Sequence, residues 1–214
     1  MSDSCIVMSR AMLARLPFYY RKIVAHAQAG HDRISSAQLA EDLSIDAAQV
    51  RRDISSLGDF GRAGIGYNVP ELLQALEEIL GVRNRTEAVL VGVGRLGSAL
   101  FQYSGFDEYG LKIVALFDSD PEKIGTELDG TLIRDVSEIE HVSKRLGIQM
   151  GIITVPAASA QGVADLLCNA GVLAIWNFAP TSLKTPEHVM VRNEDLAAGL
   201  AHLSRHIVVS TSGE

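Results

Sequence analysis

The stretch Ala88-Val-Leu-Val-Gly-Val-Gly-Arg-Leu-Gly97 decides the fold of this 214-residue chain. Its first four residues form a short apolar run typical of a buried strand, and the remaining six have the spacing G-x-G-x-x-G. A lone glycine match is weak evidence. Here it follows a strand and precedes an expected helix over 98–103, with a second strand expected over 112–117. This context predicts the first turn of a doubly wound parallel sheet.

Each glycine of this stretch has its own expected task. Gly92 allows the tight turn, Gly94 lets a pyrophosphate approach the helix N-terminus, and Gly97 permits close packing of helix on strand. Asp118 ends the next strand, about 20 residues further on. At this position a carboxylate accepts hydrogen bonds from the ribose hydroxyls of a dinucleotide and repels a 2′-phosphate. The pattern therefore favours NADH and NAD⁺ over NADPH.

Further strands and helices alternate after Asp118. Strands are expected over 150–155 and 172–176, with a weaker one at 132–133, and helices over 136–146 and 159–170. The ends of the two clearer strands carry candidate nicotinamide contacts, which are Thr154, Val155, Pro156, Asn177, Phe178 and Pro180. Ordinary strand-ending turns remain the alternative for these residues.

The first half of the chain predicts several helices. Apolar residues recur at helical spacing from Leu13 to Ala27, and Ser35 with Gln38 has the spacing of a capping box for a second helix. Asp46 and Gln49 repeat that capping pattern before an apolar stripe of Val50, Ile54 and Leu57. Two short helices joined by a tight turn are typical of a helix-turn-helix.

The third helix places Gln49, Arg51, Arg52 and Ser55 away from its apolar stripe. Arginine and glutamine each read base edges through two hydrogen bonds, so this face is a candidate for the major groove of DNA. The alternative, a solvated face of an ordinary core helix, is equally compatible with this segment taken alone.

Residues 58–67 then read Gly-Asp-Phe-Gly-Arg-Ala-Gly-Ile-Gly-Tyr, a glycine density suited to a hairpin wing. Arg62 at its tip is a candidate for a narrow minor groove. A glycine-rich surface loop is the alternative. Asn68 and Pro70 then begin a fourth helix that ends at Gly81, and 82–87 reads as a linker.

The net charge of −7 is unevenly distributed. Residues 1–85 hold ten basic and ten acidic side chains, whereas the rest holds nine basic and sixteen acidic. The first half is therefore the part expected to meet an anionic partner. Two cysteines, Cys5 and Cys168, provide neither a disulfide framework nor a zinc site. With no leader or membrane-spanning run recognised, we expect a cytoplasmic protein.

The last segment predicts a helix that begins at Asp195. Its apolar stripe, Leu196, Leu200, Leu203 and Ile207, needs a partner, which is either the parent sheet or a second subunit. His202 and His206 are spaced i, i+4, but no third ligand accompanies them, and no metal is expected.

These motifs together resemble the Rex family of redox-sensing transcriptional repressors over nearly the whole chain. Besides the glycine stretch, the matching segments are Arg15-Leu-Pro-Phe-Tyr-Tyr20, Gln49-Val-Arg-Arg-Asp53, residues 58–67, Phe117-Asp-Ser-Asp-Pro-Glu-Lys-Ile-Gly125, Asn177-Phe-Ala-Pro180 and Glu194-Asp-Leu196. One departure is Ser56-Leu57, where family members often carry an aromatic residue, which leaves the register of base contacts open.

The resemblance implies a winged helix-turn-helix over 1–82, a Rossmann-type NAD(H) domain over 83–192, and a C-terminal helix over 193–214 exchanged within a homodimer. Such repressors bind palindromic double-stranded operator DNA and release it when NADH binds. The residues implied for DNA are Ser36, Gln49, Arg51, Arg52, Ser55, Arg62, Gly64 and Tyr67. Those implied for the nucleotide are Gly92, Val93, Gly94, Arg95, Leu96, Gly97 and Asp118, together with the six strand-end residues. Arg15, Tyr103 and Asp195 match a polar network that changes partners between the two states.

Two other functions remain open from the sequence. The first is an NAD-dependent oxidoreductase with a helical accessory domain, which lacks a convincing Tyr-x-x-x-Lys pair or a histidine–carboxylate dyad. The second is a DNA-binding protein that senses another ligand, such as an acyl-CoA, against which Asp118 argues.

Overall fold

A computed structural model describes residues 8–41, 43, 45–62, 64–83, 85–195, 197 and 204. The chain divides into two compact units, Met1–Asn84 and Arg85–Glu214. In the predicted C-terminal helix over 193–214, the apolar stripe and the two histidines lie outside the described residues, namely Leu196, Leu200, Leu203, Ile207, His202 and His206.

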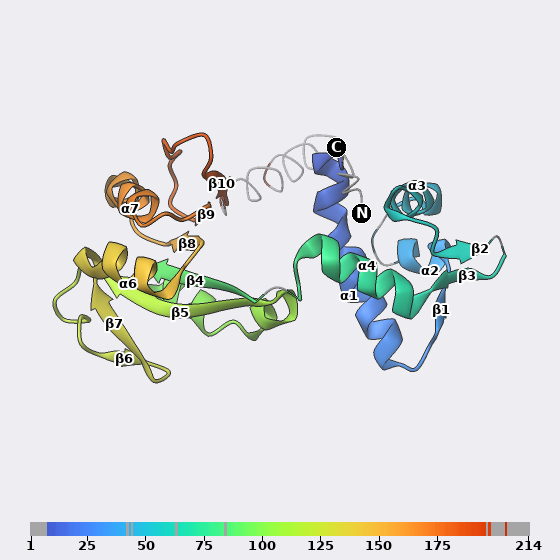
Figure 1. The fold of residues 1–214 in the computed structure, drawn as a ribbon, viewed down its shortest axis with the longest axis horizontal. Coiled ribbons are helices and arrows are strands. Elements are labelled where there is room, and N and C mark those ends of the chain that lie inside the picture. The colour runs from blue at the N-terminus through green and yellow to red at the C-terminus, as the bar shows by residue number, and fades with distance from the viewer. Residues whose placement is uncertain are drawn as a thin grey trace, which may run out of the picture. The chain divides into compact units, whose positions relative to one another are not determined.

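The first unit contains four helices among its described residues (Figure 1). They are α1 (Arg10–Gln28), α2 (Ser36–Glu41), α3 (Ala47–Leu57) and α4 (Val69–Leu80). The buried stripe of α1 differs from the prediction, because Leu13 is 42% exposed while Tyr19 is fully buried. Val50, Ile54 and Leu57 of α3 are buried as predicted.

A side chain caps the helix at all three predicted positions, but only one of the two predicted capping boxes is reciprocal. Ser35 and Gln38 cap each other, since each accepts the other's backbone N–H, at 2.8 and 3.1 Å. Asn68 accepts the Glu71 N–H at the start of α4. At α3, however, Asp46 accepts from the Ala48 N–H, and the Gln49 side chain turns to Asp53 and Arg52 rather than back to the cap. The predicted second capping box is therefore wrong in its reciprocal half.

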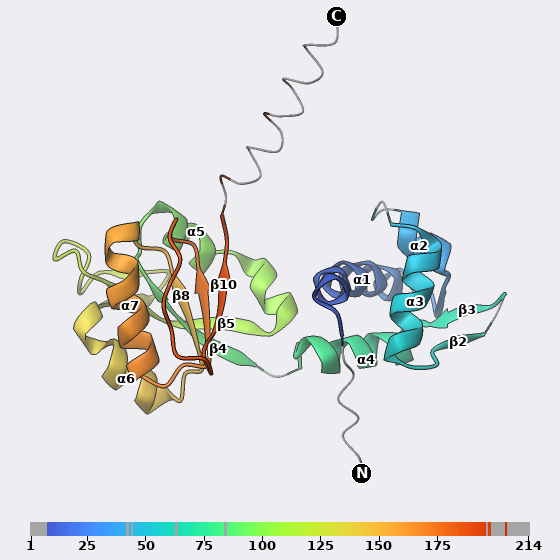
Figure 2. The same cartoon turned by 90° about the horizontal axis from the view of Figure 1, so that it is seen from above.

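Three short strands form the wing: β1 (Arg33–Ile34), β2 (Gly61–Arg62) and β3 (Gly66–Asn68), antiparallel in the order β1-β3-β2. Gly66 has φ +85°, and a Cβ there would lie 2.7 Å from the Ile34 carbonyl oxygen, so only glycine fits. The hairpin lies beside α3 in both Figure 1 and Figure 2. The winged helix-turn-helix is confirmed.

The second unit is built on a seven-stranded sheet in the order β10-β9-β8-β4-β5-β7-β6. The strands are β4 (Thr86–Val91), β5 (Leu111–Asp118), β6 (Glu127–Leu128), β7 (Thr131–Asp135), β8 (Met150–Ile153), β9 (Ala174–Asn177) and β10 (Met190–Asn193). All pairs are parallel except β6 with β7. Without β6, this is the strand order of a Rossmann sheet, with its switch point between β4 and β8, and the predicted fold class is confirmed.

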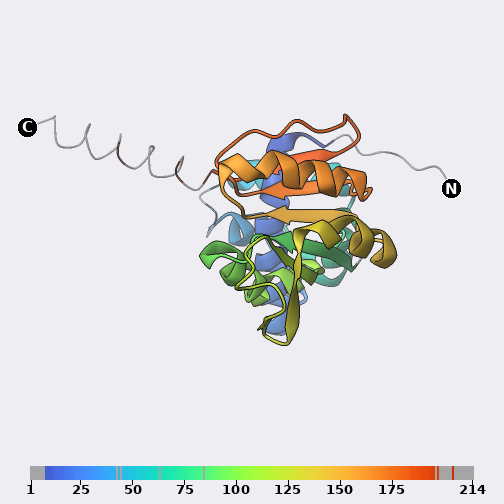
Figure 3. The same cartoon turned by 90° about the vertical axis from the view of Figure 1, so that its left-hand side faces the viewer.

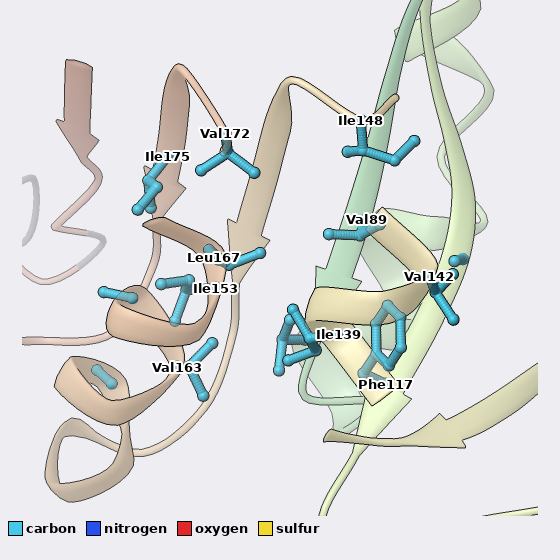
Figure 4. Close-up of a cluster of buried hydrophobic side chains, with 14 of the residues drawn as sticks. Val89, Phe117, Ile139, Val142, Ile148, Ile153, Val163, Leu167, Val172 and Ile175 are labelled. Atoms are coloured by element: carbon cyan, nitrogen blue, oxygen red, sulfur yellow. The ribbon is translucent and has the colours of Figure 1, made fainter. Parts of the chain in front are cut away.

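Helices cover both faces of this sheet (Figure 2). Figure 3 looks onto the face carrying α6 (Ile139–Leu146) and α7 (Ala157–Asn169). Figure 4 shows one buried cluster in which Val142 and Leu167 from these helices join Val89 and Phe117 from the strands. The other face packs against α5 (Arg95–Phe101) through Leu100.

Several features of this unit differ from the prediction. A 3-10 helix, η1 (Ser104–Tyr109), follows α5, and a second short one, η2 (Val136–Glu138), precedes α6. Strand β9 begins at Ala174 rather than at Val172, because Gly171 at φ +87° and the Val172 N–H to Leu167 carbonyl bond close the end of α7. Strand β10 was not predicted, since its four residues alternate only weakly in polarity.

Candidate functional site

A cleft of about 870 Å³ opens at the carboxyl edge of the sheet, at the switch point between β4 and β8. Its lining comes from both sides of that point: Gly92, Gly94, Asp118, Ser119, Lys123, Val136, Thr154, Val155, Pro156, Ser159, Gly162, Val163 and Leu166. A crevice of this kind is where open α/β sheets bind nucleotides.

The glycine loop, residues 92–97, has the geometry predicted for it. Gly92 has φ +100°, and an added Cβ would lie 2.9 Å from backbone atoms of Thr154. A Cβ at Gly97 would lie 2.0 Å from the Gly92 carbonyl oxygen, so the helix touches the loop there. A Cβ at Gly94 would meet open space, so the N-terminus of α5 is accessible to an anionic group.

Thr154 holds the loop onto β8. Its hydroxyl Oγ1 donates toward the Gly92 carbonyl at 2.7 Å and lies 3.0 Å from the Val91 carbonyl. Thr154 lines the cleft as predicted, but this hydroxyl is occupied by the loop. Its part in the site is therefore to position the glycines.

Asp118 is 7% exposed and ends β5 at the cleft. One oxygen accepts from the Val93 N–H at 2.8 Å and from Lys123 Nζ at 3.1 Å, and the other accepts from the N–H groups of Ser119 and Asp120. Burial by itself raises the pKa of Asp118, but these hydrogen bonds outweigh it and the pKa lies below its usual value. The carboxylate is therefore ionised and already tethered to the glycine loop.

Lys123 is the cation of the cleft that sequence reasoning missed. Its Nζ lies 3.1 Å from Asp118 and 3.5 Å from Asp120, and the hydrogen bond to Asp118 raises the pKa of Lys123. The sequence did contain a signal for this lysine, because it follows Asp118 by five residues, at the end of Asp-Pro-Glu-Lys.

Four of the predicted nucleotide contacts in the glycine loop, residues 92–97, do not line the cleft. Arg95 and Leu96 open α5 beyond the glycine turn, and Gly97 is buried against Gly92. Val93 is 6% exposed, and its backbone N–H is bound to Asp118. Val93 and Gly97 therefore shape the loop itself rather than the surface of the cleft.

The second strand end also lies apart from the cleft lining. Asn177 is fully buried, its amide nitrogen lies 2.8 Å from both the Thr181 carbonyl and Asn193 Oδ1, and its oxygen accepts the Ala179 N–H. This amide shapes the turn after β9. Phe178 and Pro180, which follow it, are half-buried and exposed respectively.

Phe178 belongs to a row of aromatic side chains. Ring centroids are 4.9 Å apart for Trp176 and Phe178, 5.5 Å for Phe106 and Trp176, and 5.0 Å for Tyr103 and Phe106. The row connects the turn after β9 to Tyr103, whose side chain is 58% exposed.

In the first unit, a groove of about 490 Å³ lies between α3 and the hairpin. It contains six of the eight predicted DNA contacts, within the lining Ser35, Ser36, Arg51, Ser55, Gly61, Arg62, Gly64, Ile65, Gly66 and Tyr67. Arg51 Nη1 is 3.3 Å from the Ser36 hydroxyl. Burial raises the pKa of Tyr67, so its hydroxyl remains a donor. We call this surface the wing groove.

A buried carboxylate behind the wing groove was not predicted. Asp53 on α3 is 4% exposed and accepts two hydrogen bonds from Arg15, at 2.7 and 2.8 Å, and one from the Tyr19 hydroxyl at 2.8 Å. Burial opposes its charge, yet the bonds from Arg15, Tyr19 and Gln49 lower the pKa of Asp53. The same environment, burial first and then Asp53, raises the pKa of Tyr19 to about 12.

Gln49 and Arg52 do not line the wing groove. Arg52 Nη2 donates to Gln49 Oε1 at 2.7 Å, and Gln49 Nε2 donates to Asp53 at 2.8 Å. Arg15, predicted for the switch network, is held by Asp53 within the first unit, whereas Tyr103 belongs to the second. Asp195 accepts the Ala197 N–H at 2.9 Å.

The described part of the chain contains neither a membrane-spanning helix nor a cluster of metal ligands. None of the helices there is long and apolar enough to span a membrane. Among the same residues, His, Cys, Asp and Glu nowhere gather in a group of three that would suit a metal ion.

Two family models match the chain. Residues 83–181 match the family described as "CoA binding domain", and residues 8–55 match the family described as "Putative DNA-binding protein N-terminus". The two matches fall in the second and first structural units respectively.

Curated relatives match across both units. The chain is 43% identical over 196 residues to "Redox-sensing transcriptional repressor Rex" of Roseiflexus sp. (strain RS-1), covering 92% of this chain and 89% of the relative. It is 44% identical to the protein of the same name from Clostridium beijerinckii, covering 92% and 93%.

Solved structures agree with these relatives. RSP in complex with β-NAD⁺ and operator DNA has a TM-score of 0.88 at 35% identity, covering 97% of this chain and 98% of that one. RSP in complex with β-NADH has a TM-score of 0.85 at 33% identity, covering 96% of each chain.

Proposed function

The chain belongs to the Rex family of redox-sensing transcriptional repressors, and from this premise we propose that it represses transcription by binding palindromic operator DNA and releases that DNA when NADH binds. NADH and NAD⁺ are the proposed ligands, and the protein acts as a regulator rather than as an oxidoreductase. One observation carries this function: a cleft built on G-x-G-x-x-G, with an ionised Asp118 beside it, occurs in the same chain as a winged helix-turn-helix.

In the nucleotide half, the open N-terminus of α5 at Gly94 receives the pyrophosphate, because unpaired N–H groups and the helix dipole favour an anion there. Asp118 faces the ribose, and Val155 and Pro156 supply apolar walls. Val93, Gly97 and Thr154 fix the glycine loop, Arg95 and Leu96 begin the helix at the pyrophosphate, and Asn177 shapes the turn after β9.

The preference for reduced nicotinamide is assigned to the turn after β9. NAD⁺ carries a ring charge that NADH lacks, and transferring a charge into apolar surroundings is costly. Phe178 packs on Trp176, and Ala179 is 4% exposed, so this turn provides such surroundings next to Pro180. Replacing Phe178 by Asp should reduce the ratio of NADH to NAD⁺ affinity, and an unchanged ratio would contradict the assignment.

In the DNA half, Arg51 enters the major groove and Arg62 the minor groove from the two sides of the wing groove. Ser36, Ser55, Gly64 and Tyr67 line the surface between them and reach phosphates or base edges.

The remaining parts of the proposal concern the whole protein. We assign residues 1–82 to DNA, 83–192 to the nucleotide and 193–214 to a helix exchanged in a homodimer, in the cytoplasm where operator DNA lies. Size-exclusion chromatography with light scattering tests the dimer, by comparing the full chain with a chain truncated after Glu194. A monomeric full chain would contradict it.

A gel shift tests both halves together. The probe is the operator duplex bound by RSP, with a scrambled duplex of the same length as control, titrated separately with NADH, NAD⁺, NADPH and an acyl-CoA. We expect release by NADH at the lowest concentration. Release by the acyl-CoA alone would favour the ligand named by the family model of residues 83–181.

A further inference from the structure

Gln49 is the residue of α3 whose structural surroundings disagree with a base-reading role. Bidentate recognition of adenine uses the oxygen and an N–H of the same glutamine amide. Here Gln49 Nε2 donates to Asp53 Oδ1 at 2.8 Å and Gln49 Oε1 accepts from Arg52 Nη2 at 2.7 Å. Both ends of the amide are engaged within the protein.

The orientation of this amide is fixed by its two neighbours. The carboxylate of Asp53 only accepts hydrogen bonds, and the guanidinium of Arg52 only donates them. A flipped amide would place its oxygen against the carboxylate and its nitrogen against the guanidinium. The amide therefore has one acceptable orientation, in which its oxygen faces Arg52.

Asp53 anchors this arrangement because it cannot move easily. Its side chain is buried, and Arg15 and the Tyr19 hydroxyl from α1 hold the same two oxygens at 2.7 to 2.8 Å. Gln49 therefore donates to a carboxylate that is itself held in place by two side chains of α1.

The spacing of the three residues allows both hydrogen bonds, Gln49 to Asp53 and Arg52 to Gln49, to form along one face of α3. Gln49, Arg52 and Asp53 are related as i, i+3 and i+4 on α3, so their side chains lie on one face. Arg52 is the exposed end and Asp53 the buried end of this face.

We infer that Gln49 is a positioning residue for Arg52: the chain Asp53–Gln49–Arg52 holds the Arg52 guanidinium in place before DNA arrives. A long side chain that is ordered in the free protein loses less conformational freedom on binding. This inference rests on the proposed function and adds Arg52 to its DNA contacts. Gln49, expected from the sequence to contact DNA itself, then acts through Arg52.

A double-mutant cycle on the full chain tests the inference. Affinity for the RSP operator duplex is measured for wild type, Gln49→Ala, Arg52→Ala and the double variant. Gln49→Ala should weaken binding by roughly fivefold and Arg52→Ala by roughly tenfold or more. In the Arg52→Ala background, removal of Gln49 should have no further effect.

The matched control is Gln74→Ala, which removes a glutamine whose amide also bonds an i+4 carboxylate, on α4 away from the wing groove. It should bind the operator like wild type. Gln49→Met, which keeps the length of the side chain but not its polar atoms, should reproduce Gln49→Ala, and thermal melts establish that both variants are folded.

Independent, multiplying effects of the two substitutions would overturn the inference, because Gln49 would then contact DNA by itself. An unaltered affinity in Gln49→Ala or in Arg52→Ala would overturn it as well. Failure of the proposed function is distinguishable, since wild type itself would then not prefer the operator to the scrambled duplex.

Discussion

At the scale of single residues, Asp118 and Lys123 set opposite charges beside the proposed ribose site. A carboxylate repels a 2′-phosphate, whereas an ammonium group 3.1 Å from that carboxylate attracts it. The pair therefore balances the discrimination between NADH and NADPH, rather than Asp118 deciding it alone.

Removing each of the two charges should shift the nucleotide preference in opposite directions. Asp118→Asn should reduce the preference for NADH over NADPH by roughly tenfold. Lys123→Met should increase that preference by roughly threefold, because its partly exposed charge is screened by solvent. Calorimetric titration with both nucleotides measures the ratios. If the two variants shift the ratio in the same direction, the electrostatic explanation fails.

Titration of Tyr19 should lower the stability of the first unit at high pH. Its pKa in the folded chain, about 12, lies above the ordinary value of 10.0, so the folded state favours the protonated phenol. The resulting stabilisation is fully present below pH 10 and is lost as the pH rises through about 12. We expect the difference in unfolding free energy between wild type and Tyr19→Phe to shrink across this window, as measured by urea denaturation. A constant difference would rule out this titration.

Residue-scale patterns were predictable where they are local in sequence. The caps at Ser35 and Asn68 involve partners three residues away, and the glycine loop is a contiguous motif. Asp53 was not predictable, because its main partner Arg15 is 38 residues distant and only the fold brings them together. The same reason explains Thr154, whose hydroxyl bonds a carbonyl 62 residues away.

At the scale of elements, the wing depends on how closely β1 and β3 approach each other. Gly66→Ala would place a Cβ 2.7 Å from the Ile34 carbonyl oxygen, so the two strands must separate. We expect a loss of operator affinity of at least roughly tenfold, with NADH affinity unchanged because the cleft is in the other unit.

The control for this substitution is Gly30→Ala. Gly30 has a similar φ of +80° but open space around its Cβ, so the substitution adds about 1 kcal/mol of backbone strain without a clash. Operator affinity should be retained. Equal losses in both variants would show that strain, rather than the close approach of strands, is responsible.

Elements with strong periodicity were predicted within a few residues, and those without it were missed. The apolar run of β4 and the stripe of α3 gave clear signals. Strand β10 is exposed for most of its length, so no buried face marks it in the sequence. The second capping box was wrong because the Gln49 amide finds two charged partners, which outcompete a backbone N–H.

At the scale of the whole molecule, the proposed switch is a coupling between two ligands. If NADH weakens operator binding by some factor, the operator must weaken NADH binding by the same factor. We expect equal factors in two titrations, operator with and without saturating NADH, and NADH with and without saturating operator.

A substitution in the glycine loop tests this coupling by removing nucleotide binding without altering the DNA-binding unit. Gly97→Ala places a Cβ 2.0 Å from the Gly92 carbonyl oxygen and should abolish nucleotide binding while leaving the first unit able to bind DNA. Its operator affinity should then be insensitive to NADH. Release of DNA from this variant by NADH would contradict the assignment of the cleft.

The aromatic row gives the protein an optical property. Trp176 is the only tryptophan of the chain, and its ring lies 4.9 Å from that of Phe178. Indole emits in the spectral band where reduced nicotinamide absorbs and oxidised nicotinamide does not. The tryptophan emission of the unlabelled protein should therefore decrease when NADH binds and stay unchanged when NAD⁺ binds. Intrinsic fluorescence then distinguishes the two redox forms without any added dye.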